Sequence, residues 1–389
     1  MEKKLPEGWK EYKIKDIGDV VTGSTPPKKD PENYGGVLPW IKPPDLDIDK
    51  FVSTSEETIS ETGRKKVRLL PKGSVLVSCI GNIGKVAIAD TELCTNQQIN
   101  SIIPDENIVV SDFLYYTIKK IRPYLENIAS SAVVPLLNKT DFSNINIKLP
   151  PLETQKKIVS ILEKAEETRK LRAQADELTQ KLLQSVFLEM FGDLETNPKG
   201  WVVKSFDYFA KIDTKMVKEF TAYENKPHIG IENIEKDTGD LINYNEVGAQ
   251  NLTSGKYIFT KEHIIYSKIR PNLNKVALPN FDGLCSADAY PLLVNKNHTN
   301  RYFFAYILRS KYFLDNILKL SDRTNIPKVN KDQLRSFECV CPPLELQNRF
   351  AEYVEHVEKT KKYQKQSSFE INNLFDALMQ KAFTGELVA

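Results

Sequence analysis

The sequence predicts an α+β fold that is built twice. We expect two similar α+β globes separated by two long antiparallel helices that form a coiled coil, with the two copies related by an approximate two-fold axis. The first reason is that the motif around Trp9 returns around Trp201, 192 residues later. The second is that the Pro-Pro-Leu-Glu run at Pro150 returns at Pro342 after the same interval. A long charged segment without glycine or proline follows each proline run.

The repeated motifs also place the domain boundaries. We expect a first globe at 1–149, a first long helix at 150–192, a second globe at 193–341 and a second long helix at 342–389. The middle of each globe supports the duplication, because the run that begins at Lys85 resembles the run at Lys275, and Leu93-Cys94 matches Leu284-Cys285. The small drift in spacing is what short loop insertions produce.

Composition excludes several classes of protein. With 389 residues and 41% hydrophobic content, the chain can form about two or three globular domains. It contains no apolar run of about 18 residues and no leader pattern, so we expect a cytoplasmic protein. The five cysteines form no disulfide framework and have no zinc-site spacing, and the net charge of +2 is only weakly basic.

Each long helix is predicted from its start signal and its periodicity. A proline disfavours helical backbone in the residue before it but is tolerated in the first turn of a helix, so the proline pair marks a helix start. The negative charge of Glu153 is then favourable at the helix N-terminus. In the second helix, apolar residues recur at steps of four and three, which is typical of a coiled-coil seam. The expected seam residues are Ile158, Leu162, Ala165, Leu178, Leu182, Phe350, Val354, Val357, Ile371, Phe375 and Leu378.

About 36 helical residues make a rod of about 54 Å, much longer than a small core is wide. If the two helices pack side by side, the order of elements requires them to be antiparallel. The alternative is that each helix is amphipathic and packs only on its own globe.

Strand-like runs alternate with turns in both globes. We expect strands at 75–80, 86–89, 99–103 and 145–149 in the first globe, and at 257–259, 263–266, 276–278 and 290–294 in the second. Helices are expected at 111–121 and 301–317. Turn residues at 81–84 and 270–274 fall at matching places but differ in side chains. This pattern predicts one scaffold that carries different binding loops.

These loops and two basic clusters contain the side-chain types that contact DNA. Asparagine can pair with adenine edges and arginine with guanine, while lysine holds phosphates. The candidate DNA contacts are Arg64, Lys65, Lys66, Arg68, Asn82, Lys85, Lys268, Arg270, Asn272, Asn274, Lys275, Arg323, Asn325 and Lys328. Any one of them can equally be a solvated turn or surface charge, so the loops as a class are the stronger prediction.

Motifs for catalysis are missing from the sequence. There is no phosphate loop, no dinucleotide-binding glycine motif and no Ser-His-Asp or Cys-His arrangement. No proline pair is followed by an aromatic residue, the arrangement with which adenine methyltransferases hold a flipped base. The four histidines are dispersed. We therefore expect no catalytic site, cofactor or metal in this chain.

The sequence resembles the DNA-specificity (S) subunit of type I restriction-modification systems. The resemblance rests on the repeated Pro-Pro-Leu-Glu-x-Gln motif at 150–155 and 342–347, on the Gly-Trp pairs at 8–9 and 200–201, and on the Phe-Gly-Asp and Phe-Thr-Gly-Glu helix ends. The resemblance covers essentially the whole chain. One departure is that little helix precedes the first globe.

The resemblance implies that each globe is a target recognition domain for one half of a bipartite, asymmetric DNA site. It implies that the helix pair sets the gap between the halves and docks two methyltransferase subunits. Those partners would use S-adenosylmethionine, and motor-nuclease subunits with ATP and Mg²⁺ would join the full prokaryotic complex. The chain itself would be non-catalytic.

Two other classes remain open from the residues alone. One is a DNA methyltransferase or nuclease with an unrecognised site, which methyl transfer by the single chain would reveal. The other is a coiled-coil scaffold without a DNA role, which salt-dependent DNA binding would exclude.

Overall fold

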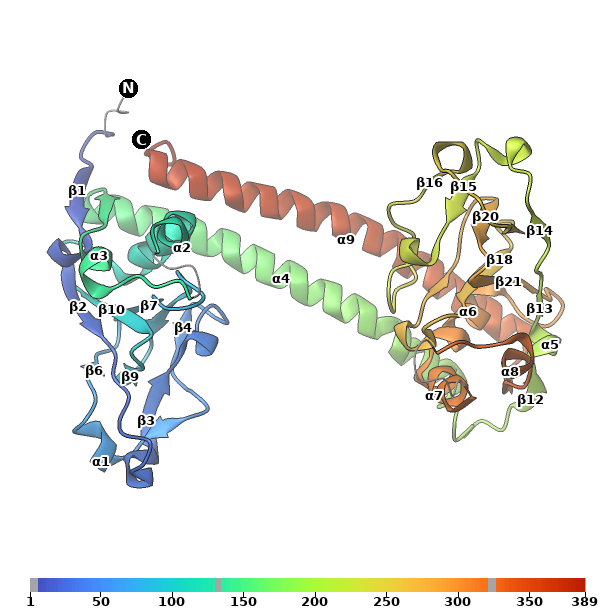
Figure 1. The fold of residues 1–389 in the computed structure, drawn as a ribbon, viewed down its shortest axis with the longest axis horizontal. Coiled ribbons are helices and arrows are strands. Elements are labelled where there is room, and N and C mark those ends of the chain that lie inside the picture. Colours follow the sequence, from blue (N-terminus) through green and yellow to red (C-terminus); the bar gives the residue numbers. More distant parts are fainter. Residues whose placement is uncertain (1–5, 130–133, 321–326, 389) are drawn as a thin grey trace. The chain divides into compact units, whose positions relative to one another are not determined.

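The structure, a computed structural model, describes residues 6–129, 134–320 and 327–388. The chain divides into two compact units. The first joins residues 1–173 to residues 367–389, and the second comprises residues 174–366. Each unit therefore holds one globe and a length of both long helices (Figure 1). The expected α+β class with two globes and two packed long helices is confirmed, whereas the division at 149, 192 and 341 stays a prediction.

The first globe contains three sheets. The largest has the order β2 (Gly18–Thr22), β10 (Ile99–Pro104), β7 (Val75–Ser78), β8 (Val86–Ala89) and β4 (Phe51–Val52). The second sheet has the order β5 (Thr58–Ile59), β3 (Tyr34–Ile41), β9 (Leu93–Thr95) and β6 (Leu69–Leu70), and β1 (Lys10–Lys13) pairs with β11 (Asn146–Leu149). The helices are α1 (Glu61–Arg64), α2 (Ser111–Ile128) and α3 (Lys139–Ser143). Most pairs are antiparallel, but β3 runs parallel to β9 and β4 to β8.

The second globe repeats this plan. The sheet β13 (Ala210–Ile212), β21 (Ala289–Val294), β18 (His263–Ser267), β19 (Val276–Ala277) corresponds to β2-β10-β7-β8. The other sheets are β14 (Met216–Val217), β17 (Lys256–Phe259), β20 (Gly283–Ser286), β15 (Pro227–Ile229), β16 (Asn245–Glu246), and the pair β12 (Val202–Ser205) with β22 (Glu338–Cys341). The helices are α5 (Phe206–Phe209), α6 (Arg301–Arg309), α7 (Lys311–Leu320) and α8 (Lys331–Arg335).

One predicted helix is divided in two. The expected helix at 301–317 is interrupted at Ser310, where α6 ends and α7 begins. The hydroxyl of Ser310 accepts a hydrogen bond from the backbone N–H of Phe313 at 3.2 Å. A serine that caps the first turn in this way favours a new helix start over continuation. The break lets both short helices bury aromatic side chains in the same core.

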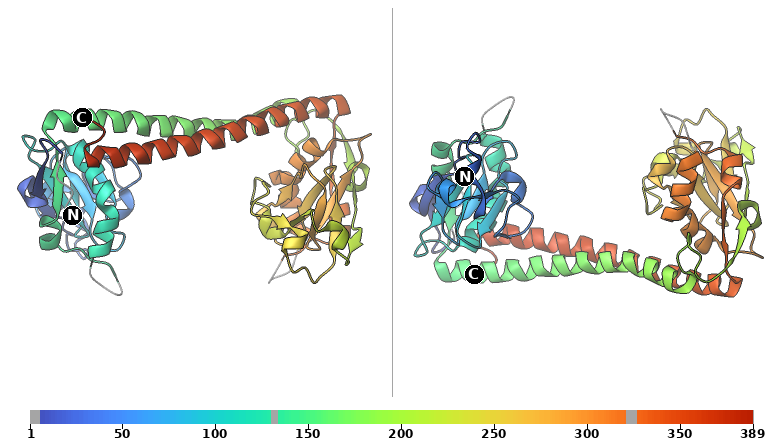
Figure 2. Two further views of the ribbon diagram at one scale, coloured as in Figure 1. Left: turned by 90° about the horizontal axis from the view of Figure 1, so that it is seen from above. Right: turned by 90° about the horizontal axis from the view of Figure 1, so that it is seen from below.

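The long helices are α4 (Leu152–Phe191) and α9 (Leu344–Thr384). In each unit they lie side by side against one flank of the globe (Figure 2). In the first unit, Ile158 and Leu162 of α4 share a core with Phe375 and Met379 of α9 and with α2. Each globe is thus covered by its own helix and by the helix of the other copy. The alternative, in which each helix packs on its own globe alone, is excluded.

In the second unit the two helix segments run antiparallel. Phe350 of α9 packs edge-on against Phe187 of α4, with ring centroids 5.4 Å apart. Further along, the amide of Gln364 donates to the hydroxyl of Thr179 at 2.8 Å. Gln364, a polar residue between the apolar positions of α9, is therefore hydrogen-bonded to α4, whereas Phe350, Val354 and Val357 are buried.

The α4 face in this unit differs from the predicted seam. Leu178 and Leu182 are 66% and 50% exposed. The helix buries Leu183, Phe187 and Phe191 instead. Spacing of three to four residues is satisfied by either set, but the aromatic pair buries more apolar area, so the helix turns that face to the core.

The repeated Pro-Pro-Leu-Glu-x-Gln motif has a structural reason. Gln155 is completely buried, and its amide donates to the carbonyls of Pro150 and Ile108, both at 2.9 Å. Its oxygen accepts from the backbone N–H of Val110 at 2.9 Å. The first turn of α4 is thereby bonded to the segment that leads into α2.

Gln347 plays the same part at the start of α9. It is also completely buried, and its amide donates to the carbonyls of Pro342 at 2.8 Å and His298 at 3.1 Å. Its oxygen accepts from the hydroxyl of Thr299 at 2.7 Å. The glutamine of the motif therefore joins helix to globe in both copies.

The end of each helix meets the start of a globe. Gly192, at φ +80°, ends α4 and lies against Pro198, while the indole N–H of Trp201 donates to the carbonyl of Phe191 at 2.9 Å. Gly385, also at φ +80°, ends α9 and lies against Pro6. A positive φ suits glycine at the residue after a helix. None of the described helices has the length and apolar character needed to cross a membrane.

Candidate nucleic-acid interface

The two predicted binding loops occupy equivalent hairpin connections. Residues 79–85 join β7 to β8, and residues 268–275 join β18 to β19. The backbone N–H of Gly81 donates to the carbonyl of Pro135 at 2.9 Å, and that of Arg270 donates to Pro327 at 2.7 Å. The repeated segments at 135–139 and 327–331 thus lie beside the loops in the same way.

The backbone of the two loops repeats although the side chains do not. Gly81 and Gly84 have φ values of +77° and +79°. At the matching positions of the second globe, Arg270 and Asn274 both have φ +48°. Left-handed backbone is easy for glycine and tolerable for asparagine, but costs other residues about 1–2 kcal/mol.

Arg270 is therefore the unusual residue of the second loop. Its side chain is exposed, and no hydrogen bond or ion pair joins it to another of the described residues. The side chain of Asn274, in contrast, donates to the carbonyl of Arg309 at 2.9 Å. Strain of this kind persists where function selects the residue.

Lys85 and Lys275 differ from the phosphate contacts expected for them. The ammonium of Lys85 donates to the carbonyl of Pro43 at 3.3 Å, and that of Lys275 donates to Ile231 at 2.8 Å. Pro43 and Ile231 each begin a short 3-10 turn. Both lysines therefore hold an equivalent turn inside their own globe, which favours a structural role.

The basic run around α1 is mostly paired within the globe. Arg64 forms an ion pair with Glu92, Lys66 lies 3.7 Å from Asp30, and Arg68 donates to the carbonyl of Thr22 at 2.5 Å. Lys65 is exposed. Surface pairs of this kind are weak, so an approaching phosphate can compete for these groups.

The remaining candidates lie at the loops or beyond the described part of the chain. Asn82, Asn272 and Lys328 are exposed. Arg323 and Asn325 fall outside the described residues. The structure therefore gathers Asn82 beside 135–139 in one globe, and Asn272 and Lys328 around the 268–275 loop in the other.

A comparison with known protein families decides the assignment. The family model described as type I restriction modification DNA specificity domain matches twice, at residues 6–180 and 198–373. The chain belongs to this family. It is a specificity subunit, a non-catalytic component of type I restriction-modification enzymes, with two target recognition domains that correspond to the two globes.

Individual relatives agree with the assignment. The MjaIX specificity subunit of Methanocaldococcus jannaschii is 28% identical, with 99% of this chain and 94% of that protein covered. The EcoDI specificity subunit of Escherichia coli is 29% identical over 72% of this chain and 71% of its own length. The crystal structure of an S subunit from M. genitalium shares the fold, with a TM-score of 0.62, 14% identity and 98% of both chains covered.

Lys268 is the one buried residue among the candidate contacts of this specificity subunit. It follows β18, and its ammonium lies 5.2 Å from the centre of the Tyr290 ring. Burial lowers the pKa of Lys268, and the charges of Lys328 and Lys331 lower it further, although Asp288 acts in the opposite sense. An ammonium among like charges is poised to accept an anion.

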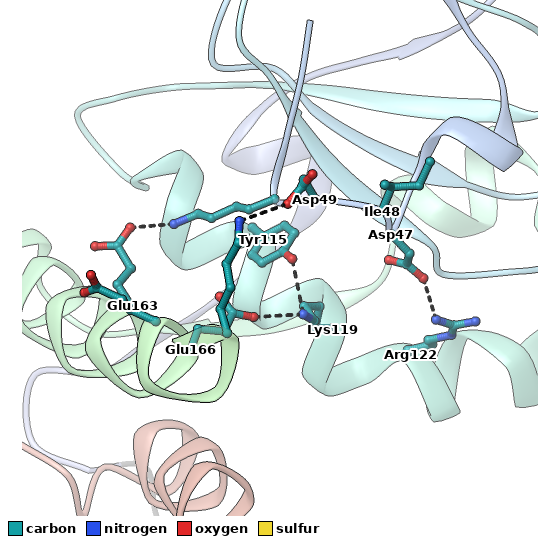
Figure 3. Close-up of a pocket in the computed structure, with 11 residues that line it drawn as sticks. Asp47, Ile48, Asp49, Tyr115, Lys119, Arg122, Glu163 and Glu166 are labelled. Atoms are coloured by element: carbon teal, nitrogen blue, oxygen red, sulfur yellow. Dashed lines mark hydrogen bonds and ion pairs between the residues drawn. The ribbon is translucent and has the colours of Figure 1, made fainter. Parts of the chain in front are cut away.

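A charged crevice of about 770 Å³ in the first unit was not foreseen from the sequence (Figure 3). Lys50 lies inside it, with its ammonium 2.6 Å from carboxylate oxygens of both Asp112 and Glu163. Burial alone would lower the pKa of Lys50, but hydrogen bonds to these two carboxylates raise it above its ordinary value. The lysine therefore stays charged and joins the 47–52 segment to α2 and α4.

Other pairs in the crevice act in the same way. Glu166 of α4 accepts from the Tyr116 hydroxyl at 2.7 Å and from Lys119 at 3.2 Å. Arg122 of α2 lies 2.8 Å from Asp47. The crevice is thus a network that fixes the first globe on α4. Among the described residues, no group of three or more histidine, cysteine, aspartate or glutamate side chains is placed to hold a metal ion.

Proposed function

We propose that each globe of this specificity subunit reads one half of a bipartite, asymmetric DNA site. The observation that carries the proposal is the pair of equivalent hairpin loops, which both have left-handed backbone at their two ends but present different side chains. Two readers with one scaffold and unlike loops would recognise unlike half-sites. Base edges in the major groove are distinguished by such side chains.

The proposal assigns the gap between the half-sites to the helix pair. The α4 and α9 helices contain 40 and 41 residues, and their side chains interlock in both units. A helix rises about 1.5 Å per residue, so the pair is a spacer of fixed length. The length of the helices would determine how many unread base pairs separate the halves.

Exposed apolar side chains on the helices favour docking of methyltransferase subunits there. Leu171 and Leu374 are exposed in the first unit, and Tyr363 and Leu182 are exposed in the second. These positions correspond under the 192-residue repeat. Each unit would therefore offer a similar apolar surface to one methyltransferase, which accounts for two such partners per chain.

The partners would supply the chemistry. The methyltransferase would bind S-adenosylmethionine and methylate adenine, while the motor-nuclease would bind ATP and Mg²⁺. The complex would work in the cytoplasm of a prokaryotic cell, where its double-stranded DNA substrate lies. The specificity subunit would choose the site.

Exchange of one globe tests the reading of half-sites. The first globe, residues 1–149, is replaced by that of another specificity subunit, and methylated adenines in host DNA are mapped by sequencing. We expect one half-site to change and the other to stay. A change in both halves, or in neither, would contradict independent reading. Methyl transfer by the chain alone would indicate that the chain is itself an enzyme. A complex that does not bind DNA would indicate a coiled-coil scaffold.

Lengthening of the helices tests the spacer. Seven residues are inserted after Ala173 and seven after Gln366, where the two units meet along the chain. Two added turns keep the seam in register and add about 10 Å, the rise of about three base pairs. We expect the gap to lengthen while both half-sites stay unchanged. An unchanged gap in an active complex would refute the spacer.

Charge substitution tests the docking surface. Leu171→Glu with Leu374→Glu should release one methyltransferase from the copurified complex and leave the other bound. Lys157→Glu, an exposed change near the start of α4, serves as the control and should retain both. Retention of both partners by the double variant would place the docking surface elsewhere.

A further inference from the structure

Four lysines of the second globe come together without an ion pair to any described carboxylate, although Asp288 lies near enough to raise the pKa of Lys268. Lys256 begins β17, Lys268 follows β18, Lys328 precedes α8 and Lys331 begins α8. A β-bridge between Ile269 and Lys328 brings the segment that leads into α8 beside the segment that follows β18. The pKa of Lys268 responds to Lys328 and Lys331, and the pKa of the Cys285 thiol responds to both Lys256 and Lys268. The four ammonium groups therefore share one region.

Two of these lysines are buried, and each meets an uncharged partner among the described residues. Lys256 is 7% exposed and Lys268 is 9% exposed. Lys256 donates to the Ser254 hydroxyl at 2.7 Å, and Lys268 faces the Tyr290 ring. In the part of the chain that the structure describes, none of the four ammonium groups lies within 4.0 Å of a carboxylate. Buried charge is normally paired, so this arrangement favours an external anion.

The first globe provides an internal comparison. Backbone bonds define the equivalence, because Leu137 donates to the carbonyl of Cys79 at 2.9 Å and Val329 donates to that of Lys268 at 2.8 Å. The bridge of Ile269 with Lys328 likewise corresponds to that of Ile80 with Leu136. The first globe therefore has Cys79 and Leu136 where the second has Lys268 and Lys328, whereas Arg68 and Lys139 stand at the positions of Lys256 and Lys331. The scaffold does not require charge at the positions of Lys268 and Lys328.

We propose that Lys256, Lys268, Lys328 and Lys331 form a site for one phosphate group of the DNA backbone, and that this four-lysine site is complete only in the second globe. The inference rests on the proposed DNA-reading function and deepens it. The occupant is a DNA phosphate because Lys268 and Lys328 flank the 270–274 loop, whose side chains would face the bases. Lysine binds phosphate as a point charge, and phosphate contacts set the register of base-reading groups.

The inference predicts unequal electrostatics in the two halves of the DNA site. The second globe would release more counterions on binding than the first globe through this position. Its contribution to affinity would therefore fall more steeply with salt. Removal of one phosphate contact lowers the log–log salt slope by about 0.9.

The test measures binding of the full-length chain to duplex DNA over a range of salt concentrations. Lys268→Met and Lys256→Met should each weaken binding several-fold at low salt, and together they should reduce the slope by about 0.9. Lys296→Met is the matched control, because this lysine is in the same globe but is paired with Glu262 at 2.6 Å. Its slope should equal that of the unaltered chain.

Thermal unfolding and lysine labelling guard against misfolding and against a different ligand. Without DNA, Lys268→Met should melt at the same or a higher temperature, because it removes an unpaired buried charge. Duplex DNA should slow acetylation of Lys268, whereas equal ionic strength of inorganic phosphate should not.

The outcomes separate this inference from the proposed function. Equal slopes for the double variant and the unaltered chain would overturn the phosphate site while DNA reading stands. Protection by inorganic phosphate but not by DNA would indicate a small-anion site and would also overturn it. Failure of the unaltered chain to bind any duplex would count against both.

Discussion

The two units hold their helices identically but present different surfaces. Gln155 and Gln347 are both completely buried, and each donates to the carbonyl of the first motif proline and to one carbonyl of the globe. The loops at 81–84 and 270–274, in contrast, share only their backbone. Where a side chain joins helix to globe it is kept in both copies, and where it faces outward it differs. The contrast separates the residues that maintain the fold from those that, under the proposed function, would distinguish two half-sites.

The largest effect is expected at the aromatic core of the second unit. Phe350 is completely buried and packs against Phe187, Phe191 and Tyr306. Phe350→Ala should destabilise this unit by about 3–5 kcal/mol. Hydrogen exchange, read unit by unit, should show faster exchange in residues 174–366 only. Equal loss of protection in the first unit would mean that the two units unfold together.

Next in size are the buried glutamines, which should respond alike. Gln155→Ala and Gln347→Ala each leave buried backbone or hydroxyl groups without partners, at about 2–3 kcal/mol. Denaturant unfolding should show similar losses, with faster exchange at the first turn of α4 or α9. A loss at one glutamine only would break the equivalence of the two attachments.

Substitution of Arg270, in contrast, is expected to raise the stability of the protein. Arg270→Gly gives the second loop the residue that the first has at Gly81, and should raise stability by up to about 1 kcal/mol by relieving left-handed backbone strain. The same variant should read the second half-site less selectively, as mapped methylation would reveal. Asn274→Gly is a useful comparison, because it also removes the bond to Arg309 and should stabilise less.

The smallest effects should come from Lys85 and Lys275. Lys85→Met and Lys275→Met each remove a single hydrogen bond to a carbonyl, at about 1 kcal/mol. Melting temperature should fall slightly in both, while the salt dependence of DNA binding should stay unchanged. A reduced salt slope would instead indicate that these lysines contact DNA phosphates, as predicted from the sequence.

The sequence revealed the architecture better than it revealed side-chain roles. The repeat and the helix periodicity predicted two globes and two long helices because motifs and apolar spacing are local properties of the chain. Phe350 and Val354, which were predicted as seam residues, are buried in the second unit. Leu178 and Leu182 are not, because a neighbouring set with two phenylalanines satisfies the same spacing.

Roles set by distant backbone could not be foreseen. The residues around Lys85 in the sequence do not indicate that its ammonium donates to the carbonyl of Pro43, more than 40 residues earlier. Lys256 was missed for the same reason, because only the sheet brings it near Lys268. Of the candidate contacts, the side chains of the 270–274 loop were recognisable from turn chemistry, and they stay predictions until DNA binding is measured.

The meeting of helix end and globe start has a consequence for how such a molecule can be assembled. Two junctions of the same kind occur. Gly192 lies against Pro198, which is close to it in sequence, whereas Gly385 lies against Pro6, at the other end of the chain. A single segment of one globe and one helix carries both halves of every such junction. Two separate copies of that segment would therefore complete each other's junctions without a covalent link between them.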